Sequence, residues 1–442
     1  MNKFDEKVYW IWLAEQSGYD SKYFVRLYTL YKKAEDVYNL ENEEIMQLDR
    51  SIPYSYKDKL CQKNLEKASA IYDYCCAKGI EVLTFVDKRY PERLRLIPDP
   101  PIVLYCKGRV PAFNENLCIG IVGTRKMSSY GRDGAYKFSY ELSSLGVCVV
   151  SGLALGVDAT AACGAIEGGA PTIQVLGCGV DVVYPKTHAR LREKVIEQGV
   201  LISEYPPLEM PQKYYFPQRN RIISGISQGV FVAECRKESG AMITASVAFS
   251  QGKDIFAYPG KVGEPTAEGP NELLRKGAYA VLTTEDIISH YKMYFNEYNE
   301  KETKTKLKTA RDSAINVSES LKKYSIPDKC EENERINTVP RLGATMGRTN
   351  EKTLSEVPKK TVEQEPQSKE TETASAPIKT AKDFGLDDKT AKVFDAIDCK
   401  KPMSVDKIVC EGLSTSDVIT ALTMLEIMGL VSSLPGGLYI RK

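Results

Sequence analysis

The chain has 442 residues, a formal net charge of +1 and only two histidines. This length exceeds what one ordinary hydrophobic core organises, so the sequence predicts two or three domains. Because the net charge is close to zero, any site for a polyanion must come from local clusters of Lys and Arg. The scarcity of histidine excludes a histidine-rich metal site and leaves almost no material for a Ser-His-Asp triad.

The twelve cysteines are scattered along the chain and form no CxxC pair. We interpret them as reduced, buried thiols, which are typical of a cytoplasmic protein. No apolar run is long enough to span a bilayer. Acidic residues beside the short apolar stretch at the N-terminus argue against a signal peptide. We therefore expect no membrane span.

Residues 1–80 predict a small helical domain. Their apolar residues recur at helical intervals in segments such as "YFVRLYTLYKKAEDVYNL". Residues 81–117 contain two strand-like pieces separated by a Pro-rich turn. We assign this second segment as the lead-in to a larger domain that extends from residue 81 to residue 296.

Residues 118–290 alternate between apolar strand candidates and amphipathic helix candidates, from "CIGIV" at the start to "YAVLT" near the end. This alternation predicts an α/β fold with a Rossmann-like, mostly parallel sheet and helices on both faces. Ligands of such sheets bind beyond the carboxyl ends of the strands. The residues that carry function should therefore lie in the strand-to-helix turns.

The C-terminal part predicts a linker followed by another small domain. Residues 297–383 are rich in Lys, Glu, Thr and Pro, which is typical of a disordered linker. Residues 384–442 fit three helices and a hairpin, the pattern of a winged helix. The third helix contains Asp417 and Glu426 but no Lys or Arg, which favours a protein contact over duplex DNA. A small stabilising appendage is the alternative.

The turn after "CIGIV" contains Gly123, Thr124, Arg125 and Lys126 and leads into a helix. Backbone N–H groups, hydroxyls and a guanidinium all favour an oxyanion, and a phosphate is the expected one. A surface turn with a solvated arginine is the alternative interpretation.

The next two turns add small residues and a further cation. Ser151 and Gly152 follow a strand, and their size lets a phosphate approach the backbone closely. Lys186 comes directly after a Tyr-Pro pair and is placed to contact a phosphate. It also fits a solvated helix face, so both interpretations stay open.

The segment "QKYYFPQRNRIISG", residues 212–225, is the most informative turn. Its cations can contact phosphates, and its aromatic rings offer flat faces for unpaired bases. Some of the rings could belong to the core, and one or two arginines could pair with acids, but the whole set exceeds that explanation. The residues that we assign to the site are Lys213, Phe216, Arg219, Asn220 and Arg221.

A later turn places Ser239 and Gly240 before a helix, where backbone N–H groups can again face an anion. The sequence has no GxxxxGK[ST] motif and no HExxH motif. Groups that hold phosphates are thus plentiful, and groups that break bonds are scarce. We therefore expect the protein to bind a polymer without a chemical reaction. We expect its site to contain no catalytic residue, no metal and no cofactor.

The motifs "GIVGTRKMSSYG", "SGLALGVDATA", "VLGCGVDVVYPK", "FPQRNRIISGIS" and "GPNELLRKGA" resemble the signature blocks of the DNA processing protein A (DprA/Smf) family. The resemblance implies a non-enzymatic single-stranded DNA-binding protein that protects incoming strands and loads the RecA recombinase during natural transformation. It also implies a homodimer formed through the Rossmann-like domain. The N-terminal helical domain is similar to the SAM- or HhH-like domain of many members, and the C-terminal domain is similar to their winged helix.

By the same resemblance, the strand would be held by Arg125, Lys186, Lys213 and Phe216. Arg219 and Arg221 match the arginines of the family's FPQRNR motif. The long linker departs from the family's pattern. The acidic third helix of the last domain also departs from what duplex binding requires.

Two alternative functions also use a fold of this kind. A nucleoside monophosphate hydrolase on a similar fold could use Glu234 and Glu238, but the sequence lacks that group's PGGxGTxxE motif. A dinucleotide-binding regulator would use the glycines of "LGCGVDV". There Gly177 and Gly179 begin a GxGxxG pattern, but Val182 replaces its third glycine.

Overall fold

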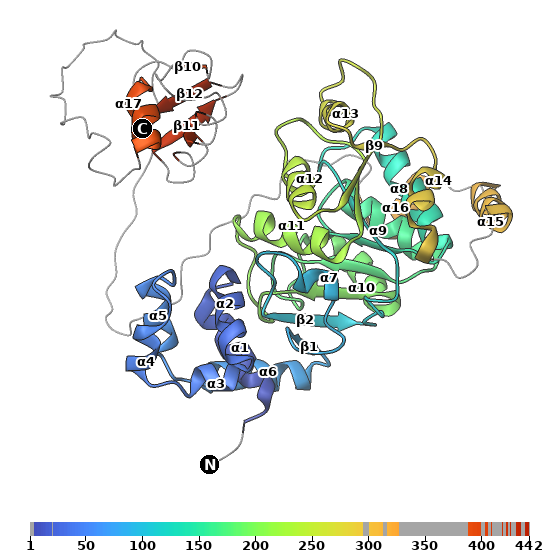
Figure 1. Ribbon diagram of the computed structural model, residues 1–442. Helices are drawn as coiled ribbons and strands as arrows, with labels where there is room; N and C mark the ends of the chain where they lie inside the picture. The colour runs from blue at the N-terminus through green and yellow to red at the C-terminus, as the bar shows by residue number, and fades with distance from the viewer. Residues whose placement is uncertain are drawn as a thin grey trace, which may run out of the picture. The chain divides into compact units, whose positions relative to one another are not determined.

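The computed structural model falls into two compact units, Met1–Leu342 and Gly343–Lys442, which we describe separately (Figure 1). None of the helices among the described residues is long and apolar enough to cross a membrane. The described residues are 4–19, 21–294, 300–312 and 316–326 in the first unit, and 388–398, 403–404, 408, 418, 421–422, 425, 430–434 and 438–441 in the second.

The N-terminal segment is helical, as the sequence predicts, and it packs beside the edge of the sheet formed by β1 (Glu81–Thr84) and β2 (Val103–Gly108) (Figure 1). Asp5 caps the first helix by accepting a hydrogen bond from the Lys7 N–H at 2.9 Å. Trp10 and Trp12 of this helix are buried in the core. The helices are α1 (Glu6–Ser17), α2 (Phe24–Tyr31), α3 (Ala34–Tyr38), α4 (Asn42–Gln47), α5 (Tyr54–Leu60) and α6 (Glu66–Ala77).

The described residues of this unit form one nine-stranded sheet in the order β1-β2-β6-β5-β4-β3-β7-β8-β9. Strands β3 to β9 pair in parallel, whereas β1 and β2 add an antiparallel edge beside β6. The strands are β1 (Glu81–Thr84), β2 (Val103–Gly108), β3 (Cys118–Val122), β4 (Cys148–Ser151), β5 (Thr172–Val175), β6 (Val200–Ser203), β7 (Gly229–Val232), β8 (Asp254–Ala257) and β9 (Tyr279–Ala280).

Helices cover both faces of the sheet, which confirms the predicted fold class. Ile119 and Ile121 of β3 pack with α8 and α9, while Val122 lies in the cluster that includes Ile222 of α11 and Ala245 of α12. This alternation follows from the two-residue period of a strand. The helices of this region are α7 (Glu92–Arg95), α8 (Ser129–Ser144), α9 (Val157–Gly168), α10 (Ala189–Gln198), α11 (Tyr215–Ile226), α12 (Gly240–Ser250), α13 (Glu268–Arg275) and α14 (Thr284–Ile288).

The strand order reverses between β3 and β7. From β3 the chain proceeds through β4 and β5 to β6 on one side, and it then returns to place β7 on the other side of β3. At such a point the two turns that follow the central strands diverge and leave a crevice. The topology therefore places the most favourable ligand site beyond the carboxyl ends of β3 and β7.

Helix α11 differs from the sequence prediction, which treats residues 212–225 as a turn. Most of this segment is helical, from Tyr215 to Ile226. Pro217 is compatible with the helix because it lies in the first turn, where its missing N–H has no intrahelical partner. Ile222, Ile223 and Ile226 are buried against the sheet. This packing outweighs the turn-like composition at the start of the segment.

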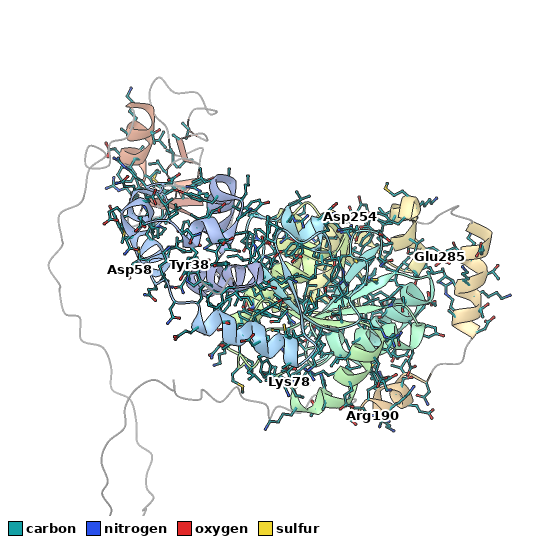
Figure 2. All side chains as sticks on the ribbon, turned by 90° about the horizontal axis from the view of Figure 1, so that it is seen from below. Tyr38, Asp58, Lys78, Arg190, Asp254 and Glu285 are labelled. Carbon is teal, nitrogen blue, oxygen red and sulfur yellow. The ribbon has the colours of Figure 1, made fainter. Side chains whose placement is uncertain are left out.

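Part of the predicted linker is also helical. Helices α15 (Glu300–Asp312) and α16 (Val317–Lys323) lie within it. Arg311 of α15 donates to the buried Glu141 at 3.0 Å and to Glu285 at 2.7 Å, and Figure 2 labels Glu285. Leu321 of α16 is fully buried. The ion pairs attach α15, and the buried Leu321 attaches α16, to the rest of the first unit despite the polar composition of the two helices.

The second unit is a small α/β cluster. Phe394 and Ile397 pack with Leu422 and Leu425. The hairpin that the sequence predicts is present, since β11 pairs antiparallel with β12. Most of the second predicted helix and most of the third lie outside the described residues, and Ser404, where the second was predicted to begin, is in β10 (Met403–Ser404). The elements are α17 (Asp388–Ala396), β10 (Met403–Ser404), β11 (Val431–Leu434) and β12 (Leu438–Arg441), and the strand order is β10-β12-β11.

Candidate functional site

A cavity of about 840 Å³ lies where the strand order reverses, and we call it the switch-point cavity. Its walls come from the turn after β3, from Lys213 and the N-terminal half of α11, from the start of α12, and from Asp158 in α9. The site residues predicted from the sequence that line it are Gly123, Thr124, Arg125, Lys213, Phe216, Arg219, Asn220, Ser239 and Gly240.

A cation and two aromatic rings stand together on one wall of the cavity. The Arg125 Cζ atom lies 5.5 Å from the centroid of the Phe216 ring, a cation–π distance. The Tyr184 ring lies 5.6 Å from the Phe216 ring and is tilted by 45°. A Cβ on Gly177 would come within 3.1 Å of the Phe216 ring, so the ring has a packed side and a side that lines the cavity.

Lys213 is exposed on a well-anchored support. Tyr215, at the start of α11, is buried and stacks on Tyr205 with 3.8 Å between ring centroids. The Tyr215 hydroxyl also donates to Glu209 at 2.9 Å. These contacts fix the first turn of α11, and Lys213, two residues before the helix, lines the cavity.

The turn that carries Arg125 packs closely against the turn that follows β4. Gly156 has a φ of +80°, and a Cβ there would lie 2.4 Å from the Thr124 carbonyl oxygen. The Val157 N–H donates to that same carbonyl at 3.2 Å. Only glycine allows this conformation and this approach together. The backbone around Arg125 is therefore supported from beneath.

Arg219 has an internal role as well as a position on the cavity wall. Its guanidinium is buried and donates to the carbonyl oxygens of Val175 and, at 2.7 Å, Gly152. Burial lowers the pKa of this guanidinium, and the nearby Asp158 opposes that change. A Cβ on Gly152 would lie 2.4 Å from an Arg219 nitrogen, so Gly152 makes room for the arginine.

Ser151 and Arg221 do not line the switch-point cavity. The Ser151 hydroxyl is buried and donates to the Ile121 carbonyl at 2.7 Å. The Arg221 side chain is 8% exposed and pairs with Glu204 at 2.7 Å and with Asp99 at 3.0 Å. Burial lowers the pKa of Arg221, but the attraction of the two acids outweighs it and keeps that pKa above its usual value. The geometry therefore gives both side chains structural partners.

Two predicted lysines lie at the edge of the site. Lys126 is exposed beside Arg125. Lys186 is exposed at the start of the short 3-10 helix Lys186–His188, directly after Tyr184 and Pro185, which line a hollow of about 40 Å³ next to the cavity. Neither lysine lines the switch-point cavity itself.

The structure adds Asp158 and Tyr184 to the cavity wall. Asp158 is buried, and burial raises the pKa of its carboxyl group, whereas Arg219 opposes that shift. The Asn220 Oδ1 atom accepts a hydrogen bond from Arg219 at 3.2 Å. Tyr184 stands two residues before Lys186, so the "YPK" segment was the sequence signal for it. Asp158 stands in the "SGLALGVDATA" segment, which predicted it in the first turn of a helix, where an acid favours the helix dipole.

The acids that a hydrolase would need are not arranged for catalysis. Glu234 is buried, and its carboxylate accepts hydrogen bonds from the Ser128 N–H at 2.9 Å and from the Thr266 hydroxyl at 2.5 Å. It does not line the switch-point cavity. Glu238 is exposed in the loop before α12. The geometry thus does not favour the hydrolase alternative.

Two family models match the chain. The model described as DNA recombination-mediator protein A matches residues 81–292, and the DprA winged helix domain model matches residues 376–437. The DNA processing protein DprA of Bacillus subtilis (strain 168) is 40% identical over 211 residues, which cover 48% of this chain and 71% of that protein.

Two further relatives extend the match. Protein Smf of Synechocystis sp. (strain ATCC 27184 / PCC 6803 / Kazusa) is 31% identical over 369 residues, which cover 83% of this chain and 81% of that protein. The X-ray structure of DNA processing protein A from Streptococcus pneumoniae superposes with a TM-score of 0.57 at 30% identity and covers 65% of this chain and 98% of that chain.

Proposed function

Because the chain belongs to the DNA recombination-mediator protein A family, which includes the DprA and Smf proteins, we propose that it binds single-stranded DNA in the switch-point cavity. The observation that carries the proposal is the Arg125 guanidinium above the Phe216 ring at the point where the strand order reverses. A cation beside an aromatic face suits a nucleotide, since one group contacts the phosphate and the other stacks on the base.

The cavity has separate places for phosphates and for bases. Arg125 and Lys213 provide positive charge, and the first turn of α12 adds backbone N–H groups near Ser239 and Gly240. No atom lies within 4 Å of the position that a Cβ on Gly240 would take, so that backbone is accessible. Phe216 offers a stacking face. None of these contacts reads a base edge, so the protein should bind strands with little sequence preference.

The test is a fluorescence-polarisation titration of a labelled oligonucleotide, single-stranded in one series and duplex in the other. Arg125→Ala and Lys213→Ala should each weaken binding to the single strand, whatever its sequence. Lys78→Ala is the matched control, because Lys78 is an exposed cation at the end of α6 and does not line the cavity (Figure 2). Unchanged affinity in both cavity variants would contradict the proposal.

Binding of single strands in this cavity also suggests a role for the protein in recombination. We infer a non-enzymatic, cytoplasmic mediator that protects incoming single strands and loads RecA onto them during natural transformation, and that acts as a homodimer. Family membership supports this inference. Strand-exchange assays with RecA test loading, and sedimentation of the purified chain tests the dimer. Cell fractionation tests the location, and a nucleotide panel screened for released base tests the absence of enzyme activity.

We also propose the domain division of the sequence as the functional one. Residues 1–80 form the helical domain, residues 81–296 bind DNA, residues 297–383 link, and residues 384–442 form the winged helix. Helices α15 and α16 extend the folded part into the proposed linker. Deleting residues 384–442 should leave affinity for single strands unchanged, since we assign a protein contact to that domain. A large loss of affinity would show that it binds DNA.

A further inference from the structure

Glu234 is tied to both ends of the segment that carries Arg125. Its carboxylate accepts a hydrogen bond from the Ser128 N–H at 2.9 Å, and its backbone carbonyl accepts one from the Thr124 N–H at 2.7 Å. The other carboxylate oxygen accepts from the Thr266 hydroxyl at 2.5 Å. The side chain is 5% exposed. One buried residue thus fixes residues 124 to 128 and anchors them to the loop after β8.

The Glu234 carboxylate also occupies the start of α8. Ser128 caps this helix by accepting from the Gly131 N–H at 3.1 Å. A Cβ on Gly131 would lie 1.8 Å from the Glu234 Oε2 atom, so the carboxylate lies directly against the first turn. An anion is stabilised there by the helix dipole. The start of α8 therefore already has an internal anion, whereas the start of α12 lines the open cavity.

We propose that Glu234 is a positioning residue for DNA binding, which acts by holding the 124–128 segment so that Arg125 stays above Phe216. This inference rests on the proposed function. An exposed arginine on a mobile turn would lose conformational freedom when it bound a phosphate, which weakens binding. A fixed backbone and a ring beneath the guanidinium reduce that loss before the strand arrives.

The start of α8 has a second attachment that does not involve Glu234. The Tyr130 hydroxyl donates to the Pro259 carbonyl at 2.7 Å, and the Tyr130 ring stacks on Tyr258 with 4.5 Å between centroids. Changes at Glu234 should therefore loosen the Arg125 segment without detaching the helix. This arrangement makes the positioning role separable from folding.

The first experiment compares two substitutions of Glu234. Glu234→Ala removes both carboxylate contacts. It should weaken single-strand binding by about tenfold, which corresponds to the free energy of about one hydrogen bond to a charged group. Glu234→Gln should stay within about threefold, because its amide oxygen can accept from Ser128 and its NH₂ can donate to Thr266. Glu238→Ala is the matched control, since Glu238 is an exposed acid in the same loop, and its affinity should not change.

The second experiment is a double-mutant cycle. If Glu234 acts through Arg125, adding Glu234→Ala to Arg125→Ala should cost little further affinity. Adding it to Lys213→Ala should cost the full factor of about ten, because Lys213 lies just before α11, outside the 124–128 segment that Glu234 holds. A general loosening of the fold would give equal costs in both backgrounds. Urea denaturation of each variant, run in parallel, reports the folded fraction.

Each outcome decides the proposal. Equal costs in the two backgrounds, or unchanged affinity in Glu234→Ala, would overturn it while leaving the proposed function intact. Absence of single-strand binding by the unaltered chain would overturn both. If Glu234→Ala does not fold, Thr266→Val removes one carboxylate contact and keeps the charge. It should then weaken binding by about threefold in the Lys213→Ala background and not in the Arg125→Ala background, and any other pattern overturns the proposal.

Discussion

Two segments of the site carry arginines, and the fold uses them differently. Arg125 stands in the turn after β3, is exposed and lies above Phe216. Arg219 and Arg221 stand in the second turn of α11, and both are buried with internal partners. The Arg125 side chain faces the cavity from an exposed part of its turn, whereas the second turn of α11 is packed inside the fold. Position within the element therefore separates a ligand contact from a structural contact.

The largest expected effect is a loss of stability, and it concerns the buried Arg221. Glu204→Ala leaves the buried Arg221 without its closest acid, which should destabilise the fold by about 3–5 kcal/mol. Urea denaturation measures the loss. The folded fraction should bind single strands as tightly as the unaltered protein. Weaker binding by that fraction would show that the α11 arginines act on DNA directly.

Arg125→Ala should give the opposite result. Loss of one charge-assisted phosphate contact is worth about 1.5–3 kcal/mol of binding, roughly a 10- to 100-fold rise in Kd. Stability should not change, because Arg125 is exposed. Polarisation titration and denaturation of the same preparation measure the two quantities. A loss of stability without a loss of affinity would reverse the roles assigned to the two segments.

Phe216→Ala sharpens the comparison by removing the ring and keeping the cation. Base stacking on an aromatic side chain contributes about 1–3 kcal/mol, so affinity should fall by roughly five- to 100-fold. The loss should shrink on an oligonucleotide with abasic sites, whereas the loss in Arg125→Ala should persist there. Equal losses on both oligonucleotides would indicate that Phe216 serves only to hold Arg125.

The smallest effect is expected at the rim. Lys186→Ala removes an exposed charge outside the cavity wall and should weaken binding by about threefold or less. Raising the salt concentration should erase the difference, because exposed charges are screened. Titrations at two salt concentrations measure it. A loss as large as that of Arg125→Ala would place Lys186 in the cavity.

The sequence predicted the sheet well, because β3 to β8 are short apolar runs that alternate with amphipathic helices. The sequence also predicted that most residues of the cavity wall lie close together, since the carboxyl ends of parallel strands share one edge of the sheet. Arg125, Lys213 and Phe216 were predicted as DNA contacts by this reasoning and by family resemblance, and that role stays a prediction. Their positions on the cavity wall are what the structure adds.

Other features depended on contacts that no local pattern encodes. The sequence allowed one or two arginines of this segment to pair with acids. Asp99 and Glu204 are distant in sequence from Arg221, so these partners could not be predicted. Glu234 has no sequence signal for its contacts with Ser128 and Thr266. For helix α11, burial of its isoleucines outweighed the turn-like composition. In α11, tertiary packing overrode the local preference for a turn, and the other contacts join residues that are distant in sequence.

The most direct test of the central claim is photo-crosslinking of single-stranded DNA that contains 5-bromodeoxyuridine, followed by mass spectrometry of the crosslinked peptides. We predict crosslinks to the peptide that contains Phe216, with a second group near Arg125, both lost in Arg125→Ala. Crosslinks confined to residues 1–80 or 384–442 would contradict the account.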